Sequence, residues 1–228
     1  MSYPDGLLPD RWAYAAWPLL TFLGLWSIRL APWSRLLQQG RLHAWLGAIV
    51  VLTLMWSMNV DSKPGLTLHL LGATTLTLMF GRALAILGLA IVLAAVTLNG
   101  TLAGAPGSMG WQTYALELLA TAAFPVLVSH ALWRASERWL PANLFIYLFV
   151  AVFLGAALTM IATGLLTTSL LWLAGIYTWA ELMEDYFPYY LLLAFAEAWL
   201  NGAAMTLMVI YTPHWVVSFD DGRYLGRR

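Results

Sequence analysis

The sequence contains no cysteine, and this absence excludes several kinds of chemistry at once. Disulfide bonds, thiolate metal sites and cysteine-ligated iron–sulfur clusters cannot form. Charged residues are also scarce, at 10% of the chain against about 25% in soluble domains. The formal net charge is zero, so no excess of one sign favours nucleic acid. No G-x-x-x-x-G-K-[ST] loop is present, which excludes an ATPase of that type within this chain.

Apolar residues make up 61% of the chain. A helix that crosses a bilayer needs about 20 mainly apolar residues. The sequence therefore predicts an all-α polytopic integral membrane protein, with about seven transmembrane helices in a single domain, 1–228. The sixth stretch is too long for one straight crossing, so it should tilt, kink near Gly155 or Gly164, or end in a surface segment around Trp172–Trp179. The seven stretches are 12–31, 43–60, 65–81, 83–104, 111–133, 143–175 and 188–212.

The basic residues predict an orientation, because short loops rich in Lys and Arg stay in the cytoplasm. Alternate connections and the tail carry Arg29, Arg35, Arg41, Arg82, Arg134, Arg138, Arg223, Arg227 and Arg228. The other set holds only Arg11 and Lys63. The pattern places the amino terminus outside and the carboxyl terminus inside, in a bacterial inner (plasma) membrane. Asp5 and Asp10 precede the first span where a signal peptide would be basic, so we expect no cleavable signal.

His69 is the most informative polar residue, because it lies just inside the outer end of the third stretch. An ionisable group within a membrane segment usually faces a cavity or pathway. Neutral imidazole is a common ligand of divalent transition metals. It can equally act as a hydrogen-bonded contact between helices. Asp5 and Asp61 are predicted on the same side of the membrane, where they could recruit a metal ion or complete its site.

Glu197 and Asn201 are four residues apart in the last stretch, so they share one helix face. A carboxylate at this depth must be protonated, paired or hydrated. Asn201 could hold Glu197 in place, or both could line a substrate pathway. Glu117, about two turns into the fifth stretch, poses the same question.

The remaining histidines and the small residues have simpler interpretations. His43 and His214 lie at the ends of predicted spans, where interfacial anchoring explains them. His130 lies four residues before Arg134 near the cytoplasmic end of the fifth stretch, where a hydrated helix end explains the pair. Small side chains recur at spacings of three and four between Gly155 and Gly164, a pattern that lets two helices approach closely. Packing within the chain and contact with another subunit both fit this pattern.

Four segments resemble those of a known family. The opening, Met1 to Pro9 (MSYPDGLLP), is similar to the Met-His-Ile-Pro-Asp-Gly start of the CbiM-type membrane components of cobalt and nickel energy-coupling-factor transporters. The stretch 68–81 (LHLLGATTLTLMFG) looks like the family's helix with a metal-binding histidine. The segment 143–147 (NLFIY) and the end, 213–225 (PHWVVSFDDGRYL), resemble more closely a branch of energy-coupling-factor ABC transporter permeases that lacks the amino-terminal Met-His motif.

The resemblance implies a metal site built from the terminal amine, the backbone and imidazole nitrogens of residue two, and the helix histidine. Only the last has a counterpart here, His69, because position two is Ser2. A square-planar site of nitrogen atoms, which suits Ni(II) or Cu(II), cannot form in the same way. Oxygen ligands from Asp5, Asp61 or Glu117 would favour another divalent ion.

The leading hypothesis is a substrate-capturing membrane subunit of an energy-coupling-factor-like importer. In it, His69 ligates a divalent transition-metal ion as substrate, Asp5 and Asp61 assist, and Glu117, Glu197 and Asn201 lie along the substrate pathway. It requires a separate transmembrane coupling subunit and ATPase subunits, and no enzymatic activity or certain resident cofactor is expected. The alternative is a non-transport accessory or assembly subunit of a larger membrane complex. A haem protein that uses His69 and His130 is a third possibility, although the two should lie toward opposite sides.

Overall fold

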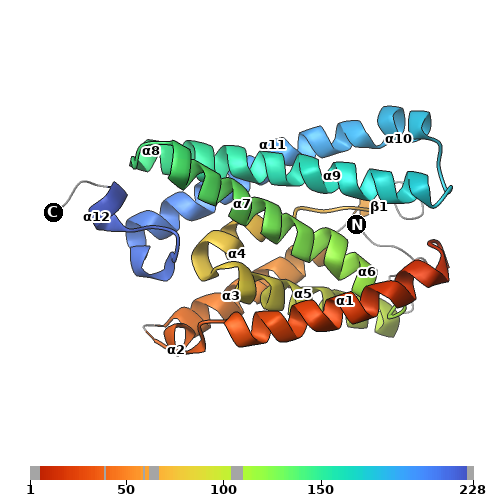
Figure 1. Cartoon of the computed structure of the whole chain (residues 1–228), viewed down its shortest axis with the longest axis horizontal. Coiled ribbons are helices and arrows are strands. Elements are labelled where there is room, and N and C mark those ends of the chain that lie inside the picture. The colour runs from red at the N-terminus through yellow and green to blue at the C-terminus, as the bar shows by residue number, and fades with distance from the viewer. Residues whose placement is uncertain (1–5, 39, 59, 62–66, 104–109, 225–228) are drawn as a thin grey trace.

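The structure is a computed structural model that describes residues 6–38, 40–58, 60–61, 67–103 and 110–224. Helices dominate the described part (Figure 1). The α-helices are α1 (Asp10–Leu30), α2 (Trp33–Leu36), α3 (Arg41–Ser57), α4 (Ala73–Phe80), α5 (Arg82–Ala103), α6 (Tyr114–Leu118), α7 (Phe124–Trp139), α8 (Leu144–Ile146), α9 (Gly155–Leu173), α10 (Trp179–Asp185), α11 (Phe187–Tyr211) and α12 (Asp221–Tyr224). Two π-helical stretches, η1 (Leu119–Ala123) and η2 (Tyr147–Leu154), and a short 3-10 helix, η3 (Pro213–Trp215), continue or follow them.

Among the described residues, four helices are long and apolar enough to cross a membrane. They are Arg82–Ala103, Tyr114–Trp139, Leu144–Leu173 and Phe187–Tyr211. The helix α3 is a shorter apolar helix that packs on α5, and α1 packs on α5 and α6. Large apolar side chains such as Phe22, Phe149 and Leu192 point outward from the bundle, as lipid-facing residues do. The prediction of a helical membrane protein is confirmed.

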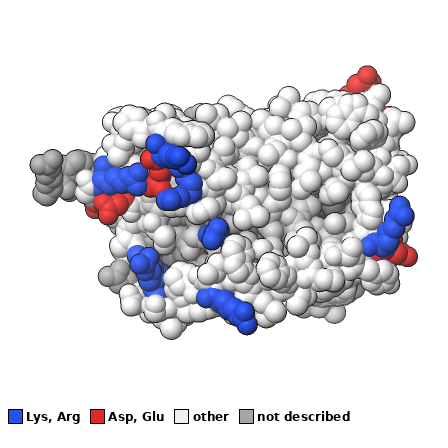
Figure 2. Space-filling view, in the orientation of Figure 1, with Lys and Arg blue, Asp and Glu red and all other residues white. Residues whose placement is uncertain are grey.

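Most charged side chains visible in Figure 2 lie over its left half, some basic ones toward the middle, and an uncharged band separates them from the charged side chains at the right end. One end contains α2, the start of α8 and α12, and most of the basic side chains visible in this view lie toward it (Figures 1 and 2). The opposite end contains α10, with Glu181, Glu184 and Asp185. A band of this kind is what a bilayer requires of a membrane protein's surface.

The third predicted stretch, 65–81, is wrong as a continuous helix. Thr67 and Leu68 form a two-residue strand, β2, which pairs antiparallel with β1 (Val60–Asp61). The chain then runs without regular structure through His69 to Gly72, and α4 begins only at Ala73. Gly72 has a φ of 64°, a left-handed conformation that glycine adopts at little cost. The helix is therefore eight residues long and begins inside the bundle (Figure 1).

The sixth stretch ends as a surface segment, one of the three predicted outcomes. Its helix runs from Leu144 to Leu173 and contains the π-helical η2. Gly175, with a φ of 72°, follows the helix, and α10 begins after a capping box between Thr178 and Glu181.

The small residues of this stretch pack within the chain. A Cβ atom on Gly164 would lie 2.5 Å from Cγ and Cδ1 of Tyr190, so α9 and α11 meet at this glycine. Gly155 differs, because a Cβ there would lie near only the carbonyl of Val150, at 3.6 Å and in the same helical run. The pattern therefore serves an intramolecular contact at Gly164, which weakens the case for a separate subunit at that face.

Candidate functional site

His69 lies in the non-helical segment before α4, with only 7% of its surface exposed. Its Nδ1 is 3.1 Å from the carbonyl oxygen of Leu70. A carbonyl can only accept, so Nδ1 carries the hydrogen and the lone pair is on Nε2. The ring also packs against Trp56 of α3, with ring centroids 4.5 Å apart. This tautomer is the one in which Nε2 can ligate a metal ion.

The β1–β2 ribbon brings one further predicted residue into the same part of the chain. Asp61 in β1 pairs with Thr67 in β2, and β2 leads directly to His69. Asp5 and Ser2 lie outside the described residues, as does the side chain of Asp61. Within the described residues, no group of three or more His, Cys, Asp or Glu side chains could hold a metal ion.

Glu197 of α11 contacts the backbone that follows His69. Its Oε2 accepts a hydrogen bond from the amide of Leu71 at 2.9 Å, and its Oε1 accepts one from the amide of Gly72 at 2.6 Å. The carboxylate is 1% exposed. These amides lie at the start of α4, where a helix leaves its first N–H groups without intrahelical partners and favours negative charge.

Asn201 contacts the same helix start from one turn further along α11. Its Oδ1 accepts from the amide of Thr75 at 2.8 Å and from the Thr75 hydroxyl at 2.6 Å. Its Nδ2 donates to Oε1 of Glu197 at 3.0 Å and to the Glu197 carbonyl at 2.7 Å. The predicted shared face of Glu197 and Asn201 is therefore confirmed. The oxygens of both side chains are occupied by the backbone and side chain of the α4 segment.

The other end of α4 is also satisfied by residues that follow α11. The amide of Val217 donates to the carbonyl of Met79, and the amide of Ser218 donates to the carbonyl of Leu78, at 3.0 and 3.1 Å. The hydroxyl of Ser218 lies 2.6 Å from the hydroxyl of Tyr147 in η2. Both ends of α4 are thus held by α11 and the segment after it.

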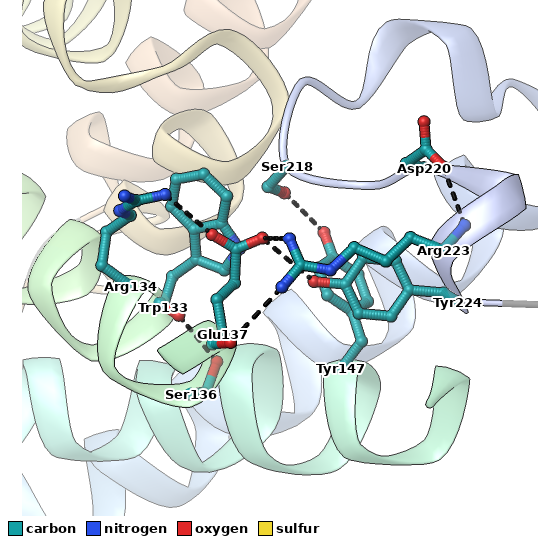
Figure 3. A network of polar contacts seen from close by, with 9 residues as sticks. All are labelled: Trp133, Arg134, Ser136, Glu137, Tyr147, Ser218, Asp220, Arg223 and Tyr224. Carbon is teal, nitrogen blue, oxygen red and sulfur yellow. Dashed lines mark hydrogen bonds and ion pairs between the residues drawn. The ribbon is translucent and has the colours of Figure 1, made fainter. Parts of the chain in front are cut away.

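A polar network near the carboxyl end was not predicted from the sequence (Figure 3). Glu137 at the end of α7 accepts hydrogen bonds from Arg134 and from Arg223 of α12, although its side chain is only 10% exposed. Burial, and then the nearby Glu137, raise the pKa of Tyr224, so its hydroxyl stays protonated and points to that carboxylate. The spacing of Arg134 and Glu137 and the charged tail were the available signals. Neither specifies that the tail docks on α7.

The other predicted residue, Glu117, lies on α6 and is 1% exposed. It is within electrostatic reach of Tyr186, whose hydroxyl contacts that of Tyr190 at 3.0 Å. Of the predicted residues, the structure therefore joins Glu197 and Asn201 to the His69 segment.

An open cleft of about 650 Å³ lies between the α8–η2 region and α11. Its lining is apolar apart from Thr206 and the indole of Trp199, and it contains no ionisable side chain. A charged ion would find no ligand there, so the cleft is separate from the candidate site.

Comparisons with known proteins agree with this architecture. The model of the CbiM family, described as the cobalt uptake substrate-specific transmembrane region, matches residues 3–215. A crystal structure of a truncated transition metal transporter is similar with a TM-score of 0.74 and 15% identity, over 92% of this chain and 99% of that one. A second transition metal transporter structure gives a TM-score of 0.75 and 16% identity, over 91% and 92%. No curated protein matches.

Proposed function

Because the chain belongs to the CbiM family, we propose that it is the substrate-capturing membrane subunit of an energy-coupling-factor-like importer. Family and fold support a membrane component of metal uptake. The finer proposal is that the captured substrate is a divalent transition-metal ion and that His69 is one of its ligands.

The observation that carries this proposal is the state of the His69 ring. Its Nδ1–H donates to the carbonyl of Leu70 and its ring packs at a tilt against Trp56, which leaves the Nε2 lone pair for a metal ion. A ligating histidine usually has its second ring nitrogen fixed in this way by a carbonyl or carboxylate. Histidine in a segment without helical hydrogen bonds can also approach a ligand with its neighbouring backbone.

The rest of the proposed site would come from nearby oxygen donors. Asp61 is in the strand that pairs next to His69, and Asp5 is the second acidic candidate. One imidazole nitrogen with carboxylate oxygens is a donor set that accepts several divalent first-row ions, so geometry would decide selectivity. Ser2 in place of the family's histidine makes these oxygens the natural replacement.

We further propose seven crossings, with the amino terminus outside and the carboxyl terminus in the cytoplasm of a bacterial inner membrane. The gathering of basic residues near α2 and α12 supports this orientation. The sequence lacks a phosphate-binding loop of the Walker type, so energy for uptake would come from separate ATPase subunits through a transmembrane coupling subunit.

The test is a metal inventory by mass spectrometry on gently extracted protein, followed by titration with Co²⁺, Ni²⁺, Zn²⁺ and Mn²⁺. His69→Ala is compared with His43→Ala, because His43 is exposed near the start of α3. We expect loss of at least about tenfold in affinity for one of these ions in His69→Ala and no change in His43→Ala. Equal affinity in wild type and His69→Ala would refute His69 as a ligand.

A further inference from the structure

We infer that Glu197 and Asn201 are positioning residues, which hold the segment that carries His69 in its binding conformation from a different helix. This inference rests on the proposed function, because it assigns these residues a role in the same site. It replaces a role along the substrate pathway with one that the observed contacts support directly. Neither side chain is proposed to touch the metal ion.

The break before α4 leaves backbone amides that need hydrogen-bond acceptors. Residues 69–72 precede the first residue of α4, and α4 starts inside the bundle. Backbone N–H groups at membrane depth must find acceptors within the protein, since no water replaces them. Glu197 accepts from the amides of Leu71 and Gly72, and Asn201 accepts from the amide of Thr75. Three donors at the start of α4 thus depend on two side chains of α11.

The backbone that Glu197 contacts lies two residues from His69. Only Leu70 separates His69 from Leu71, whose amide is bound to Glu197. Leu70 in turn supplies the carbonyl that fixes the His69 tautomer. The indole of Trp56 donates to the carbonyl of Leu71 at 3.3 Å while its ring supports His69. The segment is therefore held on one side by α3 and on the other by α11.

Glu197 and Asn201 are coupled to each other within α11. Asn201 donates to Glu197 through the same amide group whose oxygen binds Thr75. A rotation of either side chain would break contacts of both. The pair therefore acts as one clamp on the start of α4, and a shift of α11 along its axis would move the backbone next to His69.

The decisive variant is Glu197→Gln, which keeps the shape of the side chain. The glutamine has one acceptor oxygen where the carboxylate has two, so either the Leu71 or the Gly72 amide faces an NH₂ group instead of an oxygen. We expect the affinity for the ion identified above to fall about 10- to 100-fold, as for other residues that orient a metal ligand. The more conservative Glu197→Asp keeps both oxygens and should recover part of this loss.

The matched control is Thr206→Val on the same helix. The hydroxyl of Thr206 donates to the carbonyl of Gly202, within α11 itself. The affinity of Thr206→Val for the metal ion should equal that of the wild-type protein. Amide hydrogen exchange supplies a second readout, in which Leu71 and Gly72 exchange faster in Glu197→Gln than in Thr206→Val.

The outcomes separate this inference from the proposed function. If His69→Ala loses the ion but folded Glu197→Gln binds it as tightly as wild type, the positioning role is refuted and the metal site stands. If His69→Ala binds as wild type does, the proposed site itself fails. Should Glu197→Gln not fold, Glu197→Asp carries the test, because its shorter side chain draws the carboxylate away from the two amides. Wild-type affinity despite faster exchange at Leu71 and Gly72 would overturn the inference.

Discussion

The carboxylate of Glu197 lies 2.6 Å from the amide nitrogen of Gly72, although the two residues are 125 positions apart in the chain. The contact places an acidic group from the last long helix at the start of a short helix inside the bundle. Gly72 meets it in a left-handed conformation. This relationship makes the glycine as important as the carboxylate for the segment that carries His69.

Gly72→Ala should destabilise the protein by about 1–3 kcal/mol, because two costs combine. Alanine is strained at a φ of 64°, and its Cβ atom would lie 2.4 Å from Cδ2 of Leu52, which would have to move. Thermal unfolding in detergent measures the effect. The control is Gly175→Ala, which has a φ of 72° but nothing within 4 Å of the new Cβ atom. Equal losses in the two variants would show that the contact with Leu52 costs nothing.

Gly164→Ala should separate α9 from α11 and cost about 1–3 kcal/mol, because the new methyl group would overlap the ring of Tyr190. Gly155→Ala in the same helical run meets no such ring and should be neutral or slightly stabilising. Denaturant titration in mixed micelles compares the two variants. A neutral Gly164→Ala would contradict the close approach of these helices.

Tyr147→Phe should cost about 1–2 kcal/mol, because it leaves the buried hydroxyl of Ser218 without its partner at 2.6 Å. The double variant with Ser218→Ala should be less destabilised than the sum of the two single variants. A double-mutant cycle of unfolding free energies gives the coupling. Strict additivity would mean that the two hydroxyls do not support each other.

Glu137→Gln should loosen α12 from α7, since Arg134 and Arg223 lose the carboxylate that they share. Both arginines are substantially exposed, so we expect only about 1 kcal/mol, or about fivefold more frequent opening. Limited trypsin cleavage after Arg223, followed by mass spectrometry, detects the change. The control is Asp221→Asn, an exposed position on the same short helix. Equal cleavage rates in both variants would contradict a docked tail held by Glu137.

The sequence predicted the helical regions well because long apolar runs are a local signal. The sixth run, with its ending near Leu173, and the common face of Glu197 and Asn201 followed from composition and helical spacing. The break before α4 could not be predicted from the sequence, because the apolar pattern continues through it. The helix begins only at Ala73 because Gly72 is in a left-handed conformation and its amide binds the carboxylate of Glu197 in α11. Glu197 is too far away in the sequence for a local pattern to reveal this contact.

The candidate site was predictable only in part for the same reason. His69 stands out as an imidazole in an apolar run, and its tautomer depends on the adjacent Leu70. That Glu197 contacts the neighbouring backbone depends on how two distant helices pack. The Glu137 network likewise joins the end of α7 to a tail 86 residues away, through a contact that charge pattern alone does not specify.

The contacts of α4 also bear on the order in which the chain can be built. The amides at the start of α4 gain their acceptor only when Glu197 is synthesised, 126 positions after Leu71. The carbonyls at the end of α4 gain their donors only when Val217 and Ser218, which follow α11, are synthesised. While the ribosome is still extending the chain, the third apolar segment therefore lacks the partners that define its native form. The His69 segment can reach that form only after nearly the whole protein has entered the membrane.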